Sequence, residues 1–274
     1  MTVGTRIDDW DDAYANSAHI SGSAAYPPRW AEAAAAFRES MGARAEIDLP
    51  YAAGARQTFD LFRPQGEARG LVVFIHGGYW KAFDKSAWSW LAAGPLAHGW
   101  AVAMPSYTLA PAVRIAEITA EVGAAVVAAA GRVAGPLRLS GHSAGGHLAA
   151  RMITDNGPLP MPIARRVERV VSISGVHDLR PLLRTAMNAD LRLDAAEAAA
   201  ESPALLAPLP GARLLAWVGA AELPEFRRQS ALLANVWLGL GAETAAHEAP
   251  GRHHYDVIDD LAAPDSELVA GLLG

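Results

Sequence analysis

One serine of this sequence lies in a setting that suits a nucleophile. Gly141-His142-Ser143-Ala144-Gly145 follows an apolar run, 136–140, and precedes a helix-like segment, 144–154. Small residues two positions before and after a serine allow a strained turn between a strand and a helix, and such a turn lifts the hydroxyl above the sheet. The alternative is a plain glycine-rich turn in which Ser143 only caps the helix. We expect Ser143 to act as the nucleophile of an acyl-transfer reaction.

A second glycine-rich turn, His76-Gly77-Gly78-Tyr79-Trp80, follows the apolar run 71–75. Acyl transfer builds negative charge on a carbonyl oxygen, and backbone N–H groups without bulky side chains can approach that oxygen closely. Alone, this segment would be an ordinary tight turn. Together with the serine turn it indicates an oxyanion hole. The predicted donors are the N–H groups of Gly77, Gly78 and Ala144.

Half of the eight tryptophans, Trp80, Trp88, Trp90 and Trp100, fall in or just after this turn. Large apolar side chains at such positions mostly pack in a core. Tyr79 and Trp80 lie close enough to the glycines in sequence to contact a substrate. They are the predicted substrate-binding residues.

Three of the nine histidines are candidates for the base that a serine needs, since imidazole can exchange a proton near neutral pH. His177 comes before any plausible acid in the expected chain order, which favours the other two. His253 and His254 lie in a polar segment between a predicted last strand, 244–248, and the last helix. A loop at this place could hang over Ser143. The pattern by itself leaves His253 and His254 as alternatives.

A carboxylate that orients the imidazole completes such a site. Glu222 follows the apolar run 212–218 and lies in the expected turn, whereas Glu225 falls in the helix that comes next. Asp178 follows another apolar run and is the rival candidate, although an N-cap role would also explain it. We predict Glu222, because Ser143, Glu222 and a histidine after them have the chain order of α/β-hydrolases.

The composition narrows the chemistry further. No cysteine is present, which excludes a thiol nucleophile, a disulfide framework and any thiolate-bound metal. His142 and His147 are five residues apart, which is not the i, i+4 spacing of a helical zinc pair. We therefore predict no metal and no other cofactor. With 29 acidic and 23 basic residues and no basic run, the chain is not expected to bind nucleic acid.

The candidate residues all follow apolar runs that alternate with helix-like segments, which predicts an α/β fold with a mostly parallel central sheet and helices on both faces. In such sheets the ligand lies at the carboxyl ends of the strands. The predicted strands are 71–75, 100–104, 136–140, 167–173 and 212–218, and the predicted helices are 86–97, 113–130, 144–154 and 225–238.

The N-terminal part has a different pattern. Trp30, Ala34, Phe37 and Met41 recur at helical spacing after Pro27-Pro28, which predicts one amphipathic helix in an extension, 1–42, that could form part of a cap. No repeat or linker divides residues 43–274, the predicted catalytic domain. An acidic start and the lack of a long apolar run argue against a secretory signal or a membrane span, so we expect a cytoplasmic protein.

Several motifs together resemble one family. The segments His76–Trp80 and Gly141–His147 are similar to those of the α/β-hydrolase group that includes kynurenine formamidase (arylformamidase) and related bacterial esterases. Tyr107–Pro111, Pro224–Ser230 and His253–Asp256 extend the likeness over most of the chain from about residue 50, with a weaker likeness near Tyr14-Ala15-Asn16. The resemblance implies the α/β-hydrolase fold and places the catalytic histidine at His254.

The resemblance also implies an activity: cleavage of N-formylkynurenine to kynurenine and formate by a Ser143-His254-Glu222 triad acting on a small-molecule substrate. Animal formamidases of this kind have aspartate where this chain has Glu222. The family's substrate is therefore a less direct guide to the substrate of this chain. A general carboxylesterase for small acyl esters is the alternative, and a catalytically silent binding protein on the same fold is a third. Neither the sequence nor the resemblance predicts the oligomeric state.

Overall fold

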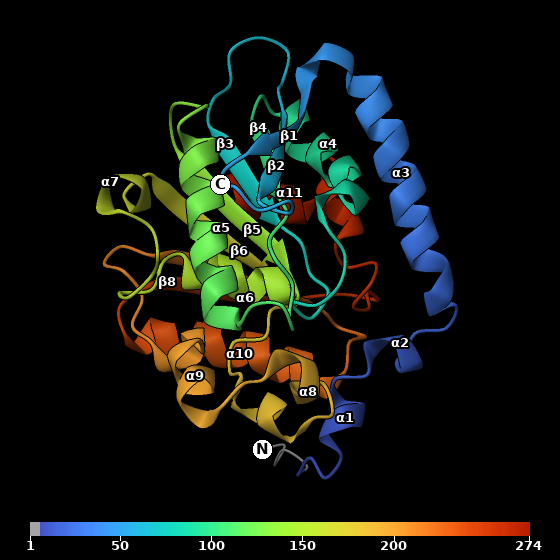
Figure 1. Ribbon diagram of the computed structural model, residues 1–274, viewed down its shortest axis with the longest axis vertical. Coiled ribbons are helices and arrows are strands. Elements are labelled where there is room, and N and C mark those ends of the chain that lie inside the picture. Colours follow the sequence, from blue (N-terminus) through green and yellow to red (C-terminus); the bar gives the residue numbers. More distant parts are fainter. Residues whose placement is uncertain (1–5) are drawn as a thin grey trace.

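A twisted sheet forms the centre of the computed structural model, which describes residues 6–274 (Figure 1). Its eight strands follow the order β1-β2-β4-β3-β5-β6-β7-β8. Strands β3 to β8 pair in parallel, while β2 is antiparallel to both β1 and β4. The strands are β1 Ala45–Pro50, β2 Thr58–Phe62, β3 Leu71–Ile75, β4 Ala101–Pro105, β5 Leu137–His142, β6 Val167–Ile173, β7 Arg213–Gly219 and β8 Glu243–Ala249. The predicted mostly parallel sheet is confirmed.

Strands β3 to β8 lie within two residues of their predicted positions at each end. For β3 to β7 the signal is an apolar run, because a buried strand reads as a continuous apolar run. Strand β8, at the other edge of the sheet, is mostly exposed and has no such run. The sequence analysis missed β1 and β2. Strand β1 is an edge strand whose residues are all exposed or half-buried, so it has no apolar run. Strand β2 carries the buried Asp60, whose carboxylate is paired with Lys85 Nζ at 2.7 Å.

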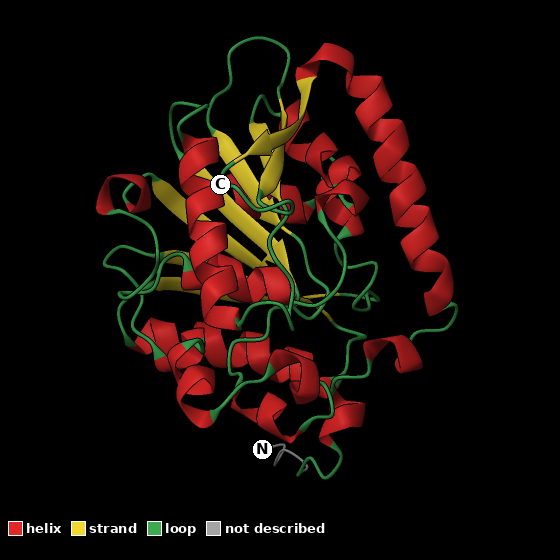
Figure 2. Cartoon of the chain, viewed as in Figure 1, coloured by secondary structure: helices red, strands yellow, loops and turns green. Residues whose placement is uncertain are grey.

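Helices cover both faces of the sheet (Figure 2). Helices α5, α6 and α10 pack on one face, and α3, α4 and α11 on the other. The helices are α1 Trp10–Ala13, α2 Asn16–His19, α3 Tyr26–Met41, α4 Ala93–Ala97, α5 Ile115–Ala130, α6 Ala144–Arg151, α7 Met161–Ala164, α8 Asn188–Leu191, α9 Ala195–Ala200, α10 Pro224–Gly239 and α11 Glu267–Leu273.

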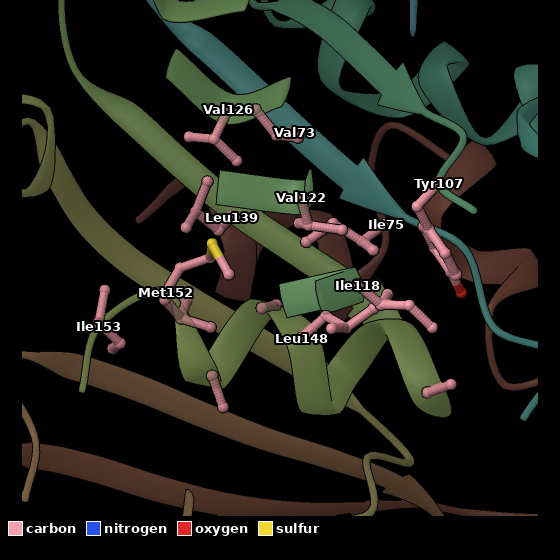
Figure 3. Close-up of a cluster of buried hydrophobic side chains, with 14 of the residues drawn as sticks. Val73, Ile75, Tyr107, Ile118, Val122, Val126, Leu139, Leu148, Met152 and Ile153 are labelled. Atoms are coloured by element: carbon pink, nitrogen blue, oxygen red, sulfur yellow. The ribbon is translucent and has the colours of Figure 1, made fainter. Parts of the chain in front are cut away.

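The core beneath the candidate nucleophile lies between β3, β5 and helices α5 and α6 (Figure 3). Val73 and Ile75 from β3 and Leu139 from β5 point toward Val122 of α5 and Leu148 of α6. All five side chains are fully buried. Because this packing fixes α6 against β3 and β5, it also fixes the turn between β5 and α6.

The segment predicted as a helix over 86–97 is broken into two short 3₁₀ turns, 85–87 and 89–92, followed by α4. Pro95 accounts for the late start of α4, since a proline has no N–H to donate and its ring clashes with the carbonyl four residues before it, that of Leu91. Gly94 lies so close to Leu261 that a β-carbon there would be 2.2 Å from the Leu261 carbonyl oxygen. The chain turns here instead of continuing one helix.

The N-terminal part contains the expected helix as α3, which buries Trp30, Ala34 and Met41. It also contains α1 and α2, which the sequence analysis missed. Figure 1 shows α3 running along one side of the molecule, and α1 near α8 at the end where the strands point. The division at residue 42 stays a prediction. Within residues 6–274, no helix is long and apolar enough to cross a membrane.

Candidate active site

Ser143 occupies the turn between β5 and α6 with φ 56° and ψ −117°, which is unfavourable for a residue with a β-carbon. Its N–H donates to the Ile173 carbonyl at 2.8 Å. The glycines around it are required by close packing. A β-carbon on Gly141 would lie 2.2 Å from the Gly145 oxygen, and one on Gly145 would lie 1.9 Å from the Ile75 oxygen.

The loop after β3 lies directly against this turn. A β-carbon on Gly77 would be 3.1 Å from the Ser143 β-carbon, and one on Gly78, at φ 110°, would be 2.4 Å from the Ala82 oxygen. The loop is strained, since Tyr79, Trp80 and Phe83 all have positive φ angles, of 50°, 57° and 68°. No substituent could replace the hydrogen of either glycine without moving the backbone.

Ala144 is the first residue of α6, so its N–H has no acceptor within the helix. The structure therefore brings the three predicted oxyanion donors, Gly77, Gly78 and Ala144, to the surroundings of Ser143. The N-terminus of α6, which is the positive end of the helix dipole, also lies at Ser143.

Glu222 and His254 form a hydrogen-bonded pair. The Nδ1 of His254 lies 2.7 Å from Glu222 Oε2, and both side chains are buried. The other carboxylate oxygen, Oε1, accepts from Ser174 Oγ at 2.5 Å and from the Gly219 N–H at 2.8 Å. Both oxygens of Glu222 thus have partners, which holds the carboxylate in one orientation.

The imidazole of His254 is held by two neighbouring rings. Phe226 lies 4.5 Å and His142 lies 4.6 Å from it between ring centroids. His142 Nε2 donates to the His254 carbonyl at 2.9 Å. Burial, followed by the proximity of His254, holds the pKa of His142 well below its usual value. His142 is therefore neutral and supports the backbone of the candidate base.

The alternatives from the sequence lie elsewhere. The Asp178 carboxylate binds the Arg180 guanidinium at 2.8 and 2.9 Å, and its Oδ1 also accepts from the Arg180 N–H. His253 Nε2 lies 3.0 Å from the Tyr26 hydroxyl. Glu225, which the sequence places in α10, is buried and binds Arg228 and Tyr14.

Ser143 and His254 open into one cavity of about 320 Å³. Aromatic side chains form one wall: Trp30 and Trp88 have ring centroids 4.8 Å apart, and Tyr255 lies 5.3 Å from Trp30. The other lining residues are Asp11, Tyr14, Ala15, Asn16, Ser17, Gly78, Tyr79, Phe83, His142 and Met187. The cavity therefore combines the candidate nucleophile and base with a wall of aromatic rings.

The prediction that Trp80 contacts a substrate is wrong. Its side chain is fully buried in the core and does not line the cavity. Its indole N–H donates to His147 Nδ1 at 3.3 Å. Two residues in a row with positive φ turn Trp80 away from the site, whereas Tyr79 does line the cavity as expected.

Several residues at the site were missed. Ser174 directly follows β6, so the rule that strand ends carry the ligand site could have found it. Trp30 could be predicted only as a buried helix residue, and nothing in residues 14–16 indicated a place in the cavity. In the described part of the chain, no group of three or more His, Asp or Glu side chains is arranged to bind a metal.

The sheet order, the strained serine turn and the buried His–Glu pair define an α/β-hydrolase, and the chain is an enzyme of the serine-hydrolase type. It belongs to the BD-FAE family, whose model matches residues 59–205. The curated relatives include kynurenine formamidase of Salmo salar, 29% identical over 242 residues that cover 83% of this chain and 80% of the relative. The kynurenine formamidase of Danio rerio is 27% identical over similar shares of 83% and 80%.

Solved structures give a consistent fold. The crystal structure of a candidate thioesterase from Silicibacter sp. TM1040 is 51% identical, covers 97% of this chain and 99% of its own, and has a TM-score of 0.93. A carbohydrate esterase from gut microbiota is 20% identical, covers 84% and 94% of the two chains, and has a TM-score of 0.65. The second likeness concerns the fold alone.

Proposed function

We propose that Ser143, His254 and Glu222 form a catalytic triad that hydrolyses the bond between a small acyl group and its leaving group. The best-supported substrate is a formamide, in which the acyl group is formyl and the leaving group is an aromatic amine. The observation that carries this proposal is the 2.7 Å hydrogen bond between Glu222 and His254, because His254 lines one aromatic-walled cavity together with Ser143. The implied reaction is hydrolysis of N-formylkynurenine to kynurenine and formate, as the sequence resemblance implies, and it is supported by the curated relatives that carry the name kynurenine formamidase.

The proposed reaction has two halves. Ser143 Oγ attacks the formyl carbon while His254 takes the hydroxyl proton, and Glu222 stabilises the resulting imidazolium. The carbon–nitrogen bond then breaks, and His254 returns the proton to the departing amine. Water, deprotonated by His254, then attacks the formyl ester of Ser143. The bond between the formyl carbon and Ser143 Oγ breaks, formate leaves, and His254 returns the proton to Ser143 Oγ. No cofactor enters these steps.

The N–H groups of Gly77, Gly78 and Ala144 are the proposed donors to the oxyanion. One such donor typically lowers the barrier by about 3 to 4 kcal/mol, because it is fixed before charge develops. The strained loop suits this role, since its backbone geometry does not have to rearrange during the reaction.

The position of the aromatic wall supports an aryl leaving group. The leaving group receives its proton from His254, so it must lie on the side of that residue. Tyr255, the next residue, and Trp30 lie on this side. Offset or edge-on stacking on these rings would stabilise a bound aryl group by about 1 kcal/mol beyond burial of its area.

Hydrolysis of small acyl esters or thioesters is the second candidate. It is favoured by the 51% identical structure, which is described as a candidate thioesterase. The same nucleophile, base and oxyanion donors would serve, because an ester, a thioester and a formamide all pass through a tetrahedral oxyanion.

One comparison of kcat/KM decides between these candidates. The substrates are N-formylkynurenine, p-nitrophenyl acetate and an acetyl thioester, each assayed with the same protein. We expect the formamide to be the best substrate. If the formamide is not cleaved while an ester or thioester is, the formamidase assignment fails and the second candidate holds. Labelling of Ser143 by a fluorophosphonate, located by peptide mass spectrometry, tests the nucleophile independently, since a silent binding protein would not react.

A further inference from the structure

The hydroxyl of Tyr79 is occupied by the N-terminal segment. Its O–H donates to the Tyr14 carbonyl oxygen at 2.5 Å and accepts from Asn16 Nδ2 at 3.1 Å. Burial raises the pKa of Tyr79, so this phenol stays protonated and remains a donor. The hydroxyl is therefore bound by the backbone of Tyr14 and the side chain of Asn16, and Tyr79 also lines the cavity.

The N-terminal segment is itself anchored on α10. The Tyr14 hydroxyl donates to Glu225 Oε1 at 2.8 Å and accepts from Gln229 Nε2 at 3.1 Å. These three side chains are nearly fully buried. The ring of Tyr14 packs edge-on against Phe226, 5.8 Å between centroids, and Phe226 in turn lies against His254. The segment thus reaches both the base and the glycine loop.

The backbone around Tyr79 needs such an anchor. Tyr79 and Trp80 both have positive φ angles, and this region of backbone conformation is unfavourable for residues with a β-carbon. Gly78 comes directly before Tyr79, so a change in the backbone of Tyr79 moves the Gly78 N–H. Two hydrogen bonds from a buried segment oppose such a change.

We propose that Tyr79 is a positioning residue through which Tyr14 and Asn16 hold the Gly77 and Gly78 N–H groups where the oxyanion forms. This inference rests on the proposed function, because it gives the glycine loop the role of an oxyanion hole. It assigns the N-terminal segment, 14–16, to the catalytic apparatus as a clamp rather than as a detachable extension.

The first test is Tyr79→Phe, which keeps the ring and removes both hydrogen bonds. We expect kcat to fall roughly tenfold or more, since a displacement of about 1 Å at a site can cost a hundredfold, while KM changes less than threefold. Fluorophosphonate labelling of Ser143 should slow by a similar factor, because the phosphoryl oxygen uses the same donors.

The matched control is Tyr51→Phe. Tyr51 also donates its hydroxyl to a backbone carbonyl, that of Ser106 at 2.8 Å, and does not line the cavity. It should lose a comparable hydrogen bond but keep kcat within about twofold. Thermal unfolding of both variants shows whether each is folded at the assay temperature.

A double-mutant cycle with Asn16→Ala separates a clamp from direct substrate binding. If Asn16 acts through the Tyr79 hydroxyl, the variant with both changes should be no slower than Tyr79→Phe alone. Additive losses of kcat, a change confined to KM, or an unchanged kcat in folded Tyr79→Phe would each overturn the clamp. Loss of turnover in Ser143→Ala alongside any of these results would leave the proposed function standing.

Discussion

The carboxyl edge of the sheet and the N-terminal part meet at the cavity, but they are held by different means. Ser143, the glycine loop and Glu222 are placed by the ends of β5, β3 and β7, whose register is fixed by backbone ladders and a close-packed core. The N-terminal part, 10–41, is attached by individual side chains such as Tyr14 and Trp30. The sheet edge therefore carries the proposed reacting groups, whereas the attached part contributes Trp30 to the aromatic wall and the contacts of residues 14–16 to the glycine loop.

The largest expected effect concerns the sheet edge. Ser143→Ala should reduce turnover by at least about 10⁴-fold, leaving only the contributions of binding and the oxyanion donors, while the fold is kept. A stopped assay with N-formylkynurenine measures it. Ser143→Gly should be equally inactive but more stable than Ser143→Ala by about 1 kcal/mol, since glycine adopts positive φ without strain. Near-normal turnover in either variant would remove Ser143 from the chemistry.

The next largest effect on kcat is expected from a change of the Glu222 carboxylate. Glu222→Gln keeps the shape of the side chain but cannot stabilise an imidazolium, so kcat should fall by about 10³- to 10⁴-fold. Asp178→Asn is the matched control, since Asp178 is bound to Arg180 and should leave kcat nearly unchanged. If Asp178→Asn were the slower variant, Asp178, in the segment after β6, would be the triad carboxylate instead of Glu222.

The third prediction tests whether Trp30, which the N-terminal part contributes to the aromatic wall, favours an aryl substrate. Trp30→Leu should lower the ratio of kcat/KM for N-formylkynurenine to that for ethyl formate by about three- to tenfold, because stacking is lost only for the aryl substrate. Trp90→Leu is the control within the same molecule, as Trp90 is half-buried and does not line the cavity. Equal losses for both substrates would mean that Trp30 matters for folding and not for selectivity.

The smallest effect concerns the attachment of α3. Asp259 binds Arg29 of that helix at 3.3 Å, and burial raises the pKa of Asp259 to about 6. The folded protein therefore binds this proton more tightly than the unfolded chain, whose aspartate pKa is about 3.9. The stability that the group contributes is complete below that value and is lost as pH rises through about 6.

Asp259→Asn should consequently raise Tm by about 2 °C at pH 7.5, with the difference shrinking to zero near pH 4. Melting curves at the two pH values measure it. A lower Tm at pH 7.5 would mean that the ion pair with Arg29 outweighs the cost of burying the carboxylate.

The same contrast explains what the sequence could predict. Apolar runs revealed β3 to β7. The residues after these strands included Ser143 and Glu222, because the topology of a parallel sheet brings the carboxyl ends of its strands together. Tyr14 and Trp30 could not be placed in this way, since their contacts depend on how a separate segment folds back over the sheet. Trp80 was misplaced because its direction depends on two backbone angles that composition and spacing do not encode.

The cavity draws its lining from segments that lie far apart in the sequence. Asp11 to Ser17 are synthesised before the glycine loop and Ser143, and His254 and Tyr255 are added after both. A ribosome-bound chain can form β3, β5 and the serine turn well before the residue that would activate the serine exists. Hydrolytic activity is therefore expected only once the chain has been translated beyond His254.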